Sequence, residues 1–113
     1  DVYKRQIVEG MWRGVNVGGT SMLARLEGLD VCGKTGTAEN PRGRDHSTFL
    51  SFAPKDNPKI AISVYVENGG FGASAALPIA SLLEEYYLTD TIRRPALLEH
   101  IKNMNIYYPS YDR

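Results

Sequence analysis

Residues 59–67 carry the clearest hydrophobic pattern of the chain, in which a branched aliphatic side chain occupies every second position. The regularly spaced aliphatic members are Ile60, Ile62, Val64 and Val66. A period of two residues predicts a β-strand with one buried face. Segments 29–38 and 46–53 predict two more strands, and short polar connections separate the three. This order predicts an antiparallel meander.

The alternation also predicts which side chains of a strand share a face. In segment 29–38, one face is expected to hold Val31, Gly33, Thr35 and Thr37. The other face is expected to hold Cys32, Lys34 and Gly36. In segment 46–53, the side chains expected to share a face are Thr48, Leu50 and Phe52.

Helical spacing precedes the meander. Val8, Trp12 and Val15, with Met11 beside them, predict a helix over residues 7–15. After Gly18-Gly19, a second short helix is expected with Thr20 or Ser21 as its cap and Gly28 as its end. Its apolar side chains would be Met22, Leu23 and Leu26.

Helical spacing also follows the meander. The apolar positions of this third helix are expected to be Ala73, Ala76, Leu77, Ala80, Leu83 and Tyr87. Because proline fits only the first turn of a helix, the regular part is expected to begin near Pro78. Residues 95–103 predict one or two further turns, and the Tyr-rich end is expected to be irregular. The fold class is therefore α/β, of the α+β type, with a three-strand meander and flanking helices.

Composition narrows the function classes. Thirteen basic and thirteen acidic residues cancel in a chain of 113 residues, so no basic footprint for nucleic acid is present. A single cysteine, Cys32, excludes an internal disulfide. Together with the distant His46 and His100 it does not form a metal-ligand pattern. We expect neither a metal nor another cofactor.

The first six residues have an unusual coding property. Asp1–Gln6 can be encoded by GAT GTG TAT AAG AGA CAG, which matches the end sequence of a transposon adapter used in shotgun DNA sequencing. Such segments are excluded from fold reasoning. We therefore expect residues 1–6 to be adapter-derived, residues 7–88 to form the folded part, and residues 89–113 to form a polar C-terminal tail.

The motif that carries chemistry is Lys34-Thr35-Gly36-Thr37, on the first predicted strand. Lys-Thr-Gly is one of three motifs that build a penicillin-interacting serine site. The other two, Ser-x-x-Lys and Ser-x-Asn, do not occur in the chain. Because the motif is short, its weight comes from its place on a strand followed by two strands and a helix.

The residue types suit an acyl-transfer site. Gly33 and Gly36 are expected to leave room for a substrate against the strand backbone. Lys34 offers a positive charge to a substrate carboxylate and to a serine that relays protons. Thr35 and Thr37 offer hydroxyls to that carboxylate, and the Thr37 N–H can stabilise an oxyanion.

The segment Val31–Glu39, Val-Cys-Gly-Lys-Thr-Gly-Thr-Ala-Glu, resembles the third-motif strand of class B penicillin-binding proteins. Segments 46–54 and 58–70, and the helix containing Ala75–Ala80, are similar to the penicillin-binding protein 2 family of the cell-elongation machinery. The resemblance covers residues 7–88. It implies the C-terminal part of a penicillin-binding, serine β-lactamase-like transpeptidase domain.

The resemblance further implies a peptidoglycan D,D-transpeptidase that acts on stem peptides and is trapped by β-lactams. Carried over by position, Lys34 is the third-motif lysine, and Thr35, Gly36 and Thr37 bind substrate. Membrane proteins of the elongation machinery are the implied partners. The implied location is the bacterial inner membrane, with the catalytic domain on its outer, periplasmic side. The chain by itself is expected to be inactive, because the serine nucleophile and its lysine partner have no counterpart in it.

Two alternatives remain open on the sequence. One is a serine β-lactamase or a β-lactam sensor domain, which share Lys-Thr-Gly. Against the β-lactamase, Ala38-Glu39 follows the motif where many of those enzymes place a glycine at position 38. The other is a structural domain of the same fold without catalytic activity.

Overall fold

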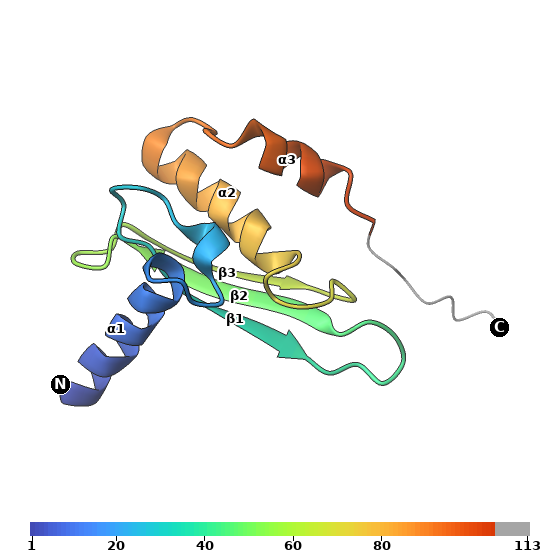
Figure 1. Cartoon of the computed structure of the whole chain (residues 1–113), viewed down its shortest axis with the longest axis horizontal. Coiled ribbons are helices and arrows are strands. Elements are labelled where there is room, and N and C mark those ends of the chain that lie inside the picture. The colour runs from blue at the N-terminus through green and yellow to red at the C-terminus, as the bar shows by residue number, and fades with distance from the viewer. Residues whose placement is uncertain (106–113) are drawn as a thin grey trace.

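The computed structural model describes residues 1–105 of the chain. In chain order the elements are α1 (Val2–Asn16), the 3-10 turn η1 (Met22–Ala24), β1 (Cys32–Ala38), β2 (His46–Ala53), β3 (Ile60–Val66), α2 (Ala76–Thr89) and α3 (Pro95–Lys102). Helix α2 lies along one face of the sheet, α3 lies beyond α2, and α1 crosses the end where β1 begins (Figure 1). The expected α/β class with a three-strand antiparallel meander is confirmed.

The sheet has the order β1-β2-β3, and both pairs are antiparallel. Strand β2 has the predicted bounds, and β3 lacks one residue at each end of the predicted segment. Strand β1 begins later than predicted, at Cys32. The reason is local: Gly28 and Asp30 both have positive φ angles, 80° and 47°, so the chain turns there instead of extending.

The face of the sheet that α2 covers is built from alternate residues of the central strand. Its members in β2 are Ser47, Phe49, Ser51 and Ala53, all buried. The pairing places Ile62 and Val64 of β3 beside Ser51 and Phe49, on the same face. The residues expected to share a face, Thr48, Leu50 and Phe52, do so, but on the side away from α2. Leu50 is therefore 51% exposed.

Small side chains let α2 approach the sheet closely. Ala76, Leu77 and Ala80 are fully buried, as their spacing predicts. The prediction is wrong for Ala73, Leu83 and Tyr87, because these three side chains are exposed and do not form the buried apolar side of the helix. The buried stripe of the helix continues instead through Ser81, Glu84 and Glu85. Apolar spacing could not reveal this, because the partners that allow the two carboxylates to be buried come from other elements.

The N-terminal elements keep the expected order with different bounds. Helix α1 includes the predicted residues 7–15 and buries Val15, but it begins at Val2 with Asp1 as its cap. The adapter origin of residues 1–6 stays a prediction. The second helix is reduced to one 3-10 turn. The predicted apolar side is wrong for Met22 and Leu23, since more than half of each side chain is exposed. The buried residues of this segment are Ala24 and Leu26.

Helix α3 falls within the predicted residues 95–103, with Pro95 as its first residue. Arg94, just before it, donates hydrogen bonds to Ser81 and Glu85 of α2 and to the Leu23 carbonyl. These bonds fix the connection between the two helices. The expectation for the Tyr-rich end concerns residues 106–113, which lie outside the described residues. No helix within residues 1–105 has the length and hydropathy required to cross a membrane.

Candidate active site

Strand β1, which carries the Lys-Thr-Gly motif, lies at an edge of the sheet. It pairs with β2 on one side, and within residues 1–105 no strand pairs with its other side. All four predicted site residues lie on it: Lys34, Thr35, Gly36 and Thr37. An edge strand offers backbone donors and acceptors to an extended ligand.

Backbone groups of successive residues in an antiparallel strand point alternately to its two edges. The Gly33 carbonyl oxygen faces α1, where a Cβ added at Gly14 would lie 3.7 Å from it. The Thr35 carbonyl oxygen accepts a hydrogen bond from Lys34 Nζ at 2.6 Å. By the same alternation, the N–H and carbonyl of Thr37 point to this outer edge.

The side chains of the motif differ in exposure. Lys34 and Thr37 are exposed, and Thr35 is half-buried. The pairing places Thr35 and Thr37 beside Phe49 and Ser47, on the α2 side, and Lys34 on the opposite face beside Leu50. The Lys34 side chain nevertheless bends to the Thr35 carbonyl at the edge, so its charge and the Thr37 backbone face the same space.

The two glycines of the strand lie against side chains of β2. A Cβ added at Gly33 would collide with the ring of Phe49, and one added at Gly36 would collide with Thr48 Oγ1. The space that these glycines leave is therefore occupied by side chains of β2. The role of the two glycines in leaving room for a substrate along the strand stays a prediction.

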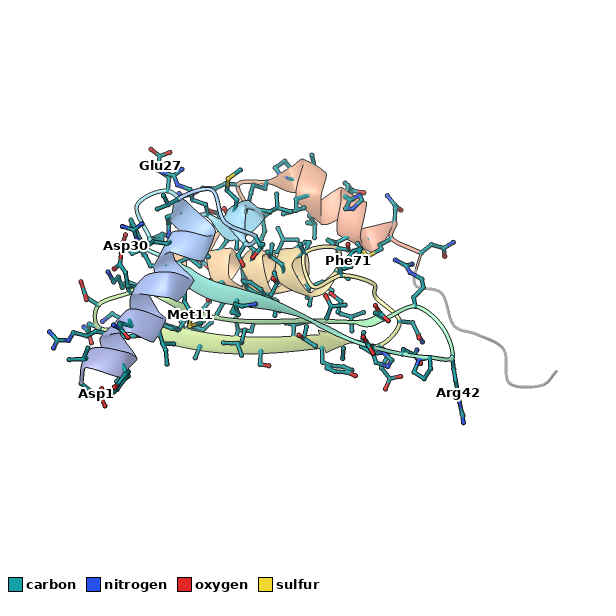
Figure 2. The ribbon with its side chains drawn as sticks, turned by 60° about the horizontal axis from the view of Figure 1, so that its bottom comes forward. Asp1, Met11, Glu27, Asp30, Arg42 and Phe71 are labelled. Atoms are coloured by element: carbon teal, nitrogen blue, oxygen red, sulfur yellow. The ribbon has the colours of Figure 1, made fainter. Side chains whose placement is uncertain are left out.

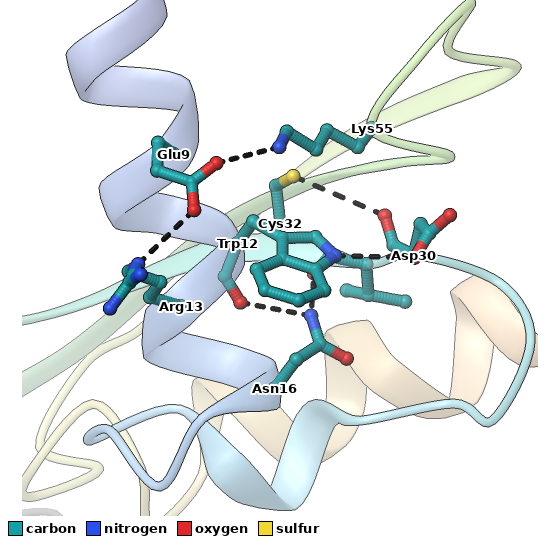
Figure 3. A network of polar contacts seen from close by, with 8 residues as sticks. Glu9, Trp12, Arg13, Asn16, Asp30, Cys32 and Lys55 are labelled. Atoms are coloured by element: carbon teal, nitrogen blue, oxygen red, sulfur yellow. Dashed lines mark hydrogen bonds and ion pairs between the residues drawn. The ribbon is translucent and has the colours of Figure 1, made fainter.

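Helix α1 is fastened beside the start of the motif strand by polar contacts (Figure 3). Asn16 donates to the Val31 carbonyl at 2.9 Å. Trp12 Nε1 donates to Asp30 at 3.2 Å, and the Lys55 ammonium lies 5.3 Å from the Trp12 ring centroid. This arrangement covers the beginning of the outer edge of β1 and leaves residues 34–38 accessible.

Lys55 also pairs with Glu9 of α1, with its Nζ atom 2.7 Å from Glu9 Oε1. The hydrogen bond from Lys55, followed by that from Arg13, lowers the pKa of the Glu9 carboxyl. This carboxylate therefore stays ionised and holds the loop after β2 to α1.

Cys32 precedes the motif and is completely buried. Burial raises the pKa of its thiol to about 11. The thiolate is the nucleophilic form of cysteine, so this residue is not a nucleophile near neutral pH. Its Sγ atom lies 4.0 Å from the Asp30 carbonyl oxygen, just before the strand.

The connection between β3 and α2 reaches the motif strand, which the sequence did not reveal. Gly72 N–H donates to Thr37 Oγ1 at 3.2 Å. Ser47, fully buried, accepts from Ala76 N–H at 2.9 Å and lies 2.8 Å from the Phe71 carbonyl. The glycine-rich composition of residues 69–72 was visible in the sequence, but nothing in it indicated a contact with Thr37.

The loop after β1 is tied to the same connection. Asn40 donates to the side chain of Asn68 at 2.8 Å, and Gly70 N–H donates to the Asp45 carbonyl at 2.8 Å. A pocket of about 210 Å³ lies beside these contacts, lined by Arg44, Asp45, Gly70, Phe71 and Ser74. Figure 2 shows Arg42 at the far end of this loop, away from the body of the sheet.

Two kinds of site are not found in residues 1–105. No serine hydroxyl there hydrogen bonds to a lysine, so the nucleophile–base pair of a serine acyl-transfer site is not formed among these residues. In the same part of the chain, no three His, Cys, Asp or Glu side chains gather as metal ligands. Neither a serine–lysine pair nor a metal-ligand cluster is therefore formed among the described residues.

Comparison with known proteins shows which family the chain resembles. Residues 2–83 match the family model described as the penicillin-binding protein transpeptidase domain. The peptidoglycan D,D-transpeptidase MrdA of Haemophilus influenzae is 36% identical over 100 residues, which cover 74% of this chain and 15% of that protein. The MrdA of Acinetobacter baumannii is 36% identical over 92 residues, covering 68% of this chain and 14% of that protein.

Solved structures of penicillin-binding proteins are also similar to the chain. Pseudomonas aeruginosa PBP2 in complex with WCK 5153 is 39% identical and superposes with a TM-score of 0.62, covering 73% of this chain and 18% of that one. The imipenem acyl-enzyme of penicillin-binding protein A from M. tuberculosis is 33% identical, with a TM-score of 0.64 over 75% of this chain and 19% of that one. The chain thus spans less than a fifth of the length of these proteins. It belongs to the penicillin-binding protein transpeptidase domain family.

Proposed function

We propose that the full-length protein containing this chain is a serine-type peptidoglycan D,D-transpeptidase, and that the chain contributes the third-motif strand of its active site. The observation that carries the proposal is the open outer edge of β1. There the Lys34 ammonium and the backbone of Thr37 face one space, as a substrate laid along the strand would require. The curated relatives named D,D-transpeptidases support the same activity.

In this proposal the chain's residues bind and polarise the substrate. The Lys34 ammonium attracts the terminal carboxylate of a stem peptide, and the hydroxyls of Thr35 and Thr37 are its hydrogen-bond donors. Gly36 leaves the space that Thr48 Oγ1 occupies beside the strand, because a Cβ at position 36 would lie against this atom. The N–H of Thr37 stabilises the oxyanion that forms when the substrate carbonyl is attacked.

The covalent step requires groups from the rest of the full-length protein. A serine oxygen there attacks the carbonyl of the penultimate D-alanine, and the terminal D-alanine leaves as the free amino acid. An amine of a neighbouring peptidoglycan strand then attacks the acyl-enzyme and releases the serine. β-Lactams acylate the same serine. Anchoring in the inner membrane, an extracytoplasmic location and contacts with elongation-machinery membrane proteins belong to the same proposal.

Labelling with a fluorescent penicillin tests this function. The full-length protein should take up one covalent label that persists, and it should release D-alanine from a stem pentapeptide. Rapid loss of the label with hydrolysis of the penicillin would instead identify a β-lactamase. Absence of any label would indicate a structural domain of the same fold without catalytic activity. The 113-residue chain alone should remain unlabelled, because its sequence contains no Ser-x-x-Lys motif.

A further inference from the structure

The β3–α2 connection lies directly against the motif strand at Gly72. A Cβ added to this residue would lie 2.5 Å from the Gly36 carbonyl oxygen, 2.6 Å from that of Thr48 and 2.8 Å from the Gly36 nitrogen. These are backbone atoms of a paired position of β1 and β2, so they cannot move aside as a flexible side chain can. Only glycine allows this approach.

The requirement for glycine at position 72 is steric. Gly70, two residues earlier, has a φ of +84°, a conformation that side-chain-bearing residues rarely adopt. The φ of Gly72 lies outside that left-handed range. Alanine could therefore adopt the same backbone conformation, and its effect would come from pushing the connection away from Gly36.

The close approach places one donor on the motif. Gly72 N–H donates to Thr37 Oγ1 at 3.2 Å. A threonine hydroxyl has one proton to donate and two lone pairs that accept. Because Gly72 engages a lone pair, the hydroxyl proton remains for another acceptor, and the bond that the hydroxyl accepts strengthens the one that it donates. Thr37 is exposed, so that acceptor can come from a ligand.

The connection is also fixed on its other side. The buried Ser47 hydroxyl accepts from Ala76 N–H and lies within hydrogen-bond distance of the carbonyl oxygens of Phe71 and Gly72, at 2.8 and 3.2 Å. Ser47 is the pairing partner of Thr37 across the two strands. Gly72 is thus held at a defined place relative to the hydroxyl that it contacts.

We propose that Gly72 is a positioning residue of the active site: its N–H orients the Thr37 hydroxyl as a donor to the substrate carboxylate, and its missing side chain makes this contact geometrically feasible. The inference rests on the proposed transpeptidase function. It assigns a part in substrate binding to the β3–α2 connection, outside the Lys-Thr-Gly motif itself.

The test is the second-order rate of acylation by a fluorescent penicillin, measured on the full-length protein. Gly72→Ala should lower this rate about tenfold, the loss typical of one hydrogen bond of about 1.4 kcal/mol. In a Thr37→Val background the same substitution should change the rate by less than about twofold, because the hydroxyl that it orients is already absent. Gly10→Ala is the matched control, since nothing lies within 4 Å of a Cβ added there.

The outcomes separate the two proposals. If the unmodified protein is not acylated, the proposed function fails. If it is acylated and Gly72→Ala reacts at the same rate, the positioning role is wrong. The role is also wrong if Gly72→Ala lowers the acylation rate by the same factor in the parent and in the Thr37→Val background. If circular dichroism shows that Gly72→Ala does not fold, Ser47→Ala is used in its place to test the positioning role. It releases the connection without adding atoms, and its loss of rate should likewise vanish in the Thr37→Val background.

Discussion

Lys34 and Thr35 are joined by a hydrogen bond from the lysine ammonium to the carbonyl oxygen of its own neighbour, 2.6 Å away. Simple alternation places their side chains on opposite faces of β1, which is awkward if both serve one ligand. The bond resolves this, because the Lys34 side chain bends around the strand and brings its charge to the outer edge. The edge, rather than either face, is therefore where the groups of the motif converge.

Lys34→Ala in the full-length protein should greatly reduce acylation by a β-lactam while the fold is kept. Loss of one electrostatic contact at a partly dehydrated acyl-transfer site typically lowers the rate roughly 10²–10³-fold. The measurement is the second-order acylation rate, with circular dichroism as the control for folding. Lys59→Ala removes another exposed lysine, just before β3, and should have no such effect. Acylation of Lys34→Ala at the parent rate would show that the motif is not used.

Thr37→Val should lower the acylation rate less than Lys34→Ala does. The substitution removes the hydroxyl but keeps the β-branched shape and the backbone N–H that is proposed to stabilise the oxyanion. A hydrogen bond to a charged carboxylate contributes about 1.5–3 kcal/mol, which corresponds to a loss of roughly 10-fold to 150-fold. Thr37→Ser, which retains the hydroxyl, should stay close to the parent rate. A larger loss for Thr37→Val than for Lys34→Ala would contradict these roles.

The Cys32 thiol should be unreactive in the folded protein. It is completely buried, and burial raises the pKa of the thiol to about 11, so at a pH of about 8 almost none is thiolate. Titration with a thiol reagent should show no reaction at this residue under native conditions and full reaction in denaturant. Mass spectrometry of the peptide containing Cys32 identifies the site. Rapid native labelling of Cys32 would show that α1 does not cover the start of β1.

The elements that the sequence predicted well are those with strong local patterns. The bounds of β2 and β3 follow from alternation and polar connections, and the Lys-Thr-Gly motif lies on a strand as its context required. Strand β1 begins later than its alternation predicts, because the positive φ of Asp30 has no strong sequence marker. Local pattern therefore predicted the framework of the site.

Long-range contacts account for what the sequence could not predict. The contact between Gly72 and Thr37 joins residues 35 positions apart, and Gly33 is needed because of Phe49 on another strand. The burial of Glu84 depends on Ser51 of β2, again a partner distant in sequence. In each case the identity of one residue is explained only by a neighbour that the fold supplies.

Glu84 makes the stability of the fold depend on pH. Its side chain is fully buried between α2 and the sheet, where both carboxyl oxygens lie 2.9 Å from Ser51 Oγ. Burial raises the pKa of this carboxyl from 4.5 to about 7, and the Ser51 hydrogen bond opposes the change only in part. The folded state therefore binds a proton that the unfolded state releases near pH 4.5. Stability from this group is complete below about pH 4.5 and is lost as pH rises through 7.

Glu84→Gln should remove this dependence. The amide stays neutral at every pH and can still hydrogen bond with Ser51, so the variant should melt at a higher temperature than the parent above about pH 7. A rise in pKa from 4.5 to about 7 corresponds to roughly 3 kcal/mol of lost stability in the parent at high pH. The measurement is the difference in Tm between variant and parent from about pH 4.5 to about pH 8, with the exposed Glu27→Gln as the matched control. We expect the difference to grow as pH rises from 4.5 toward 8. A difference that is constant with pH, or that shrinks as pH rises, would show that Glu84 is not held in a desolvated site.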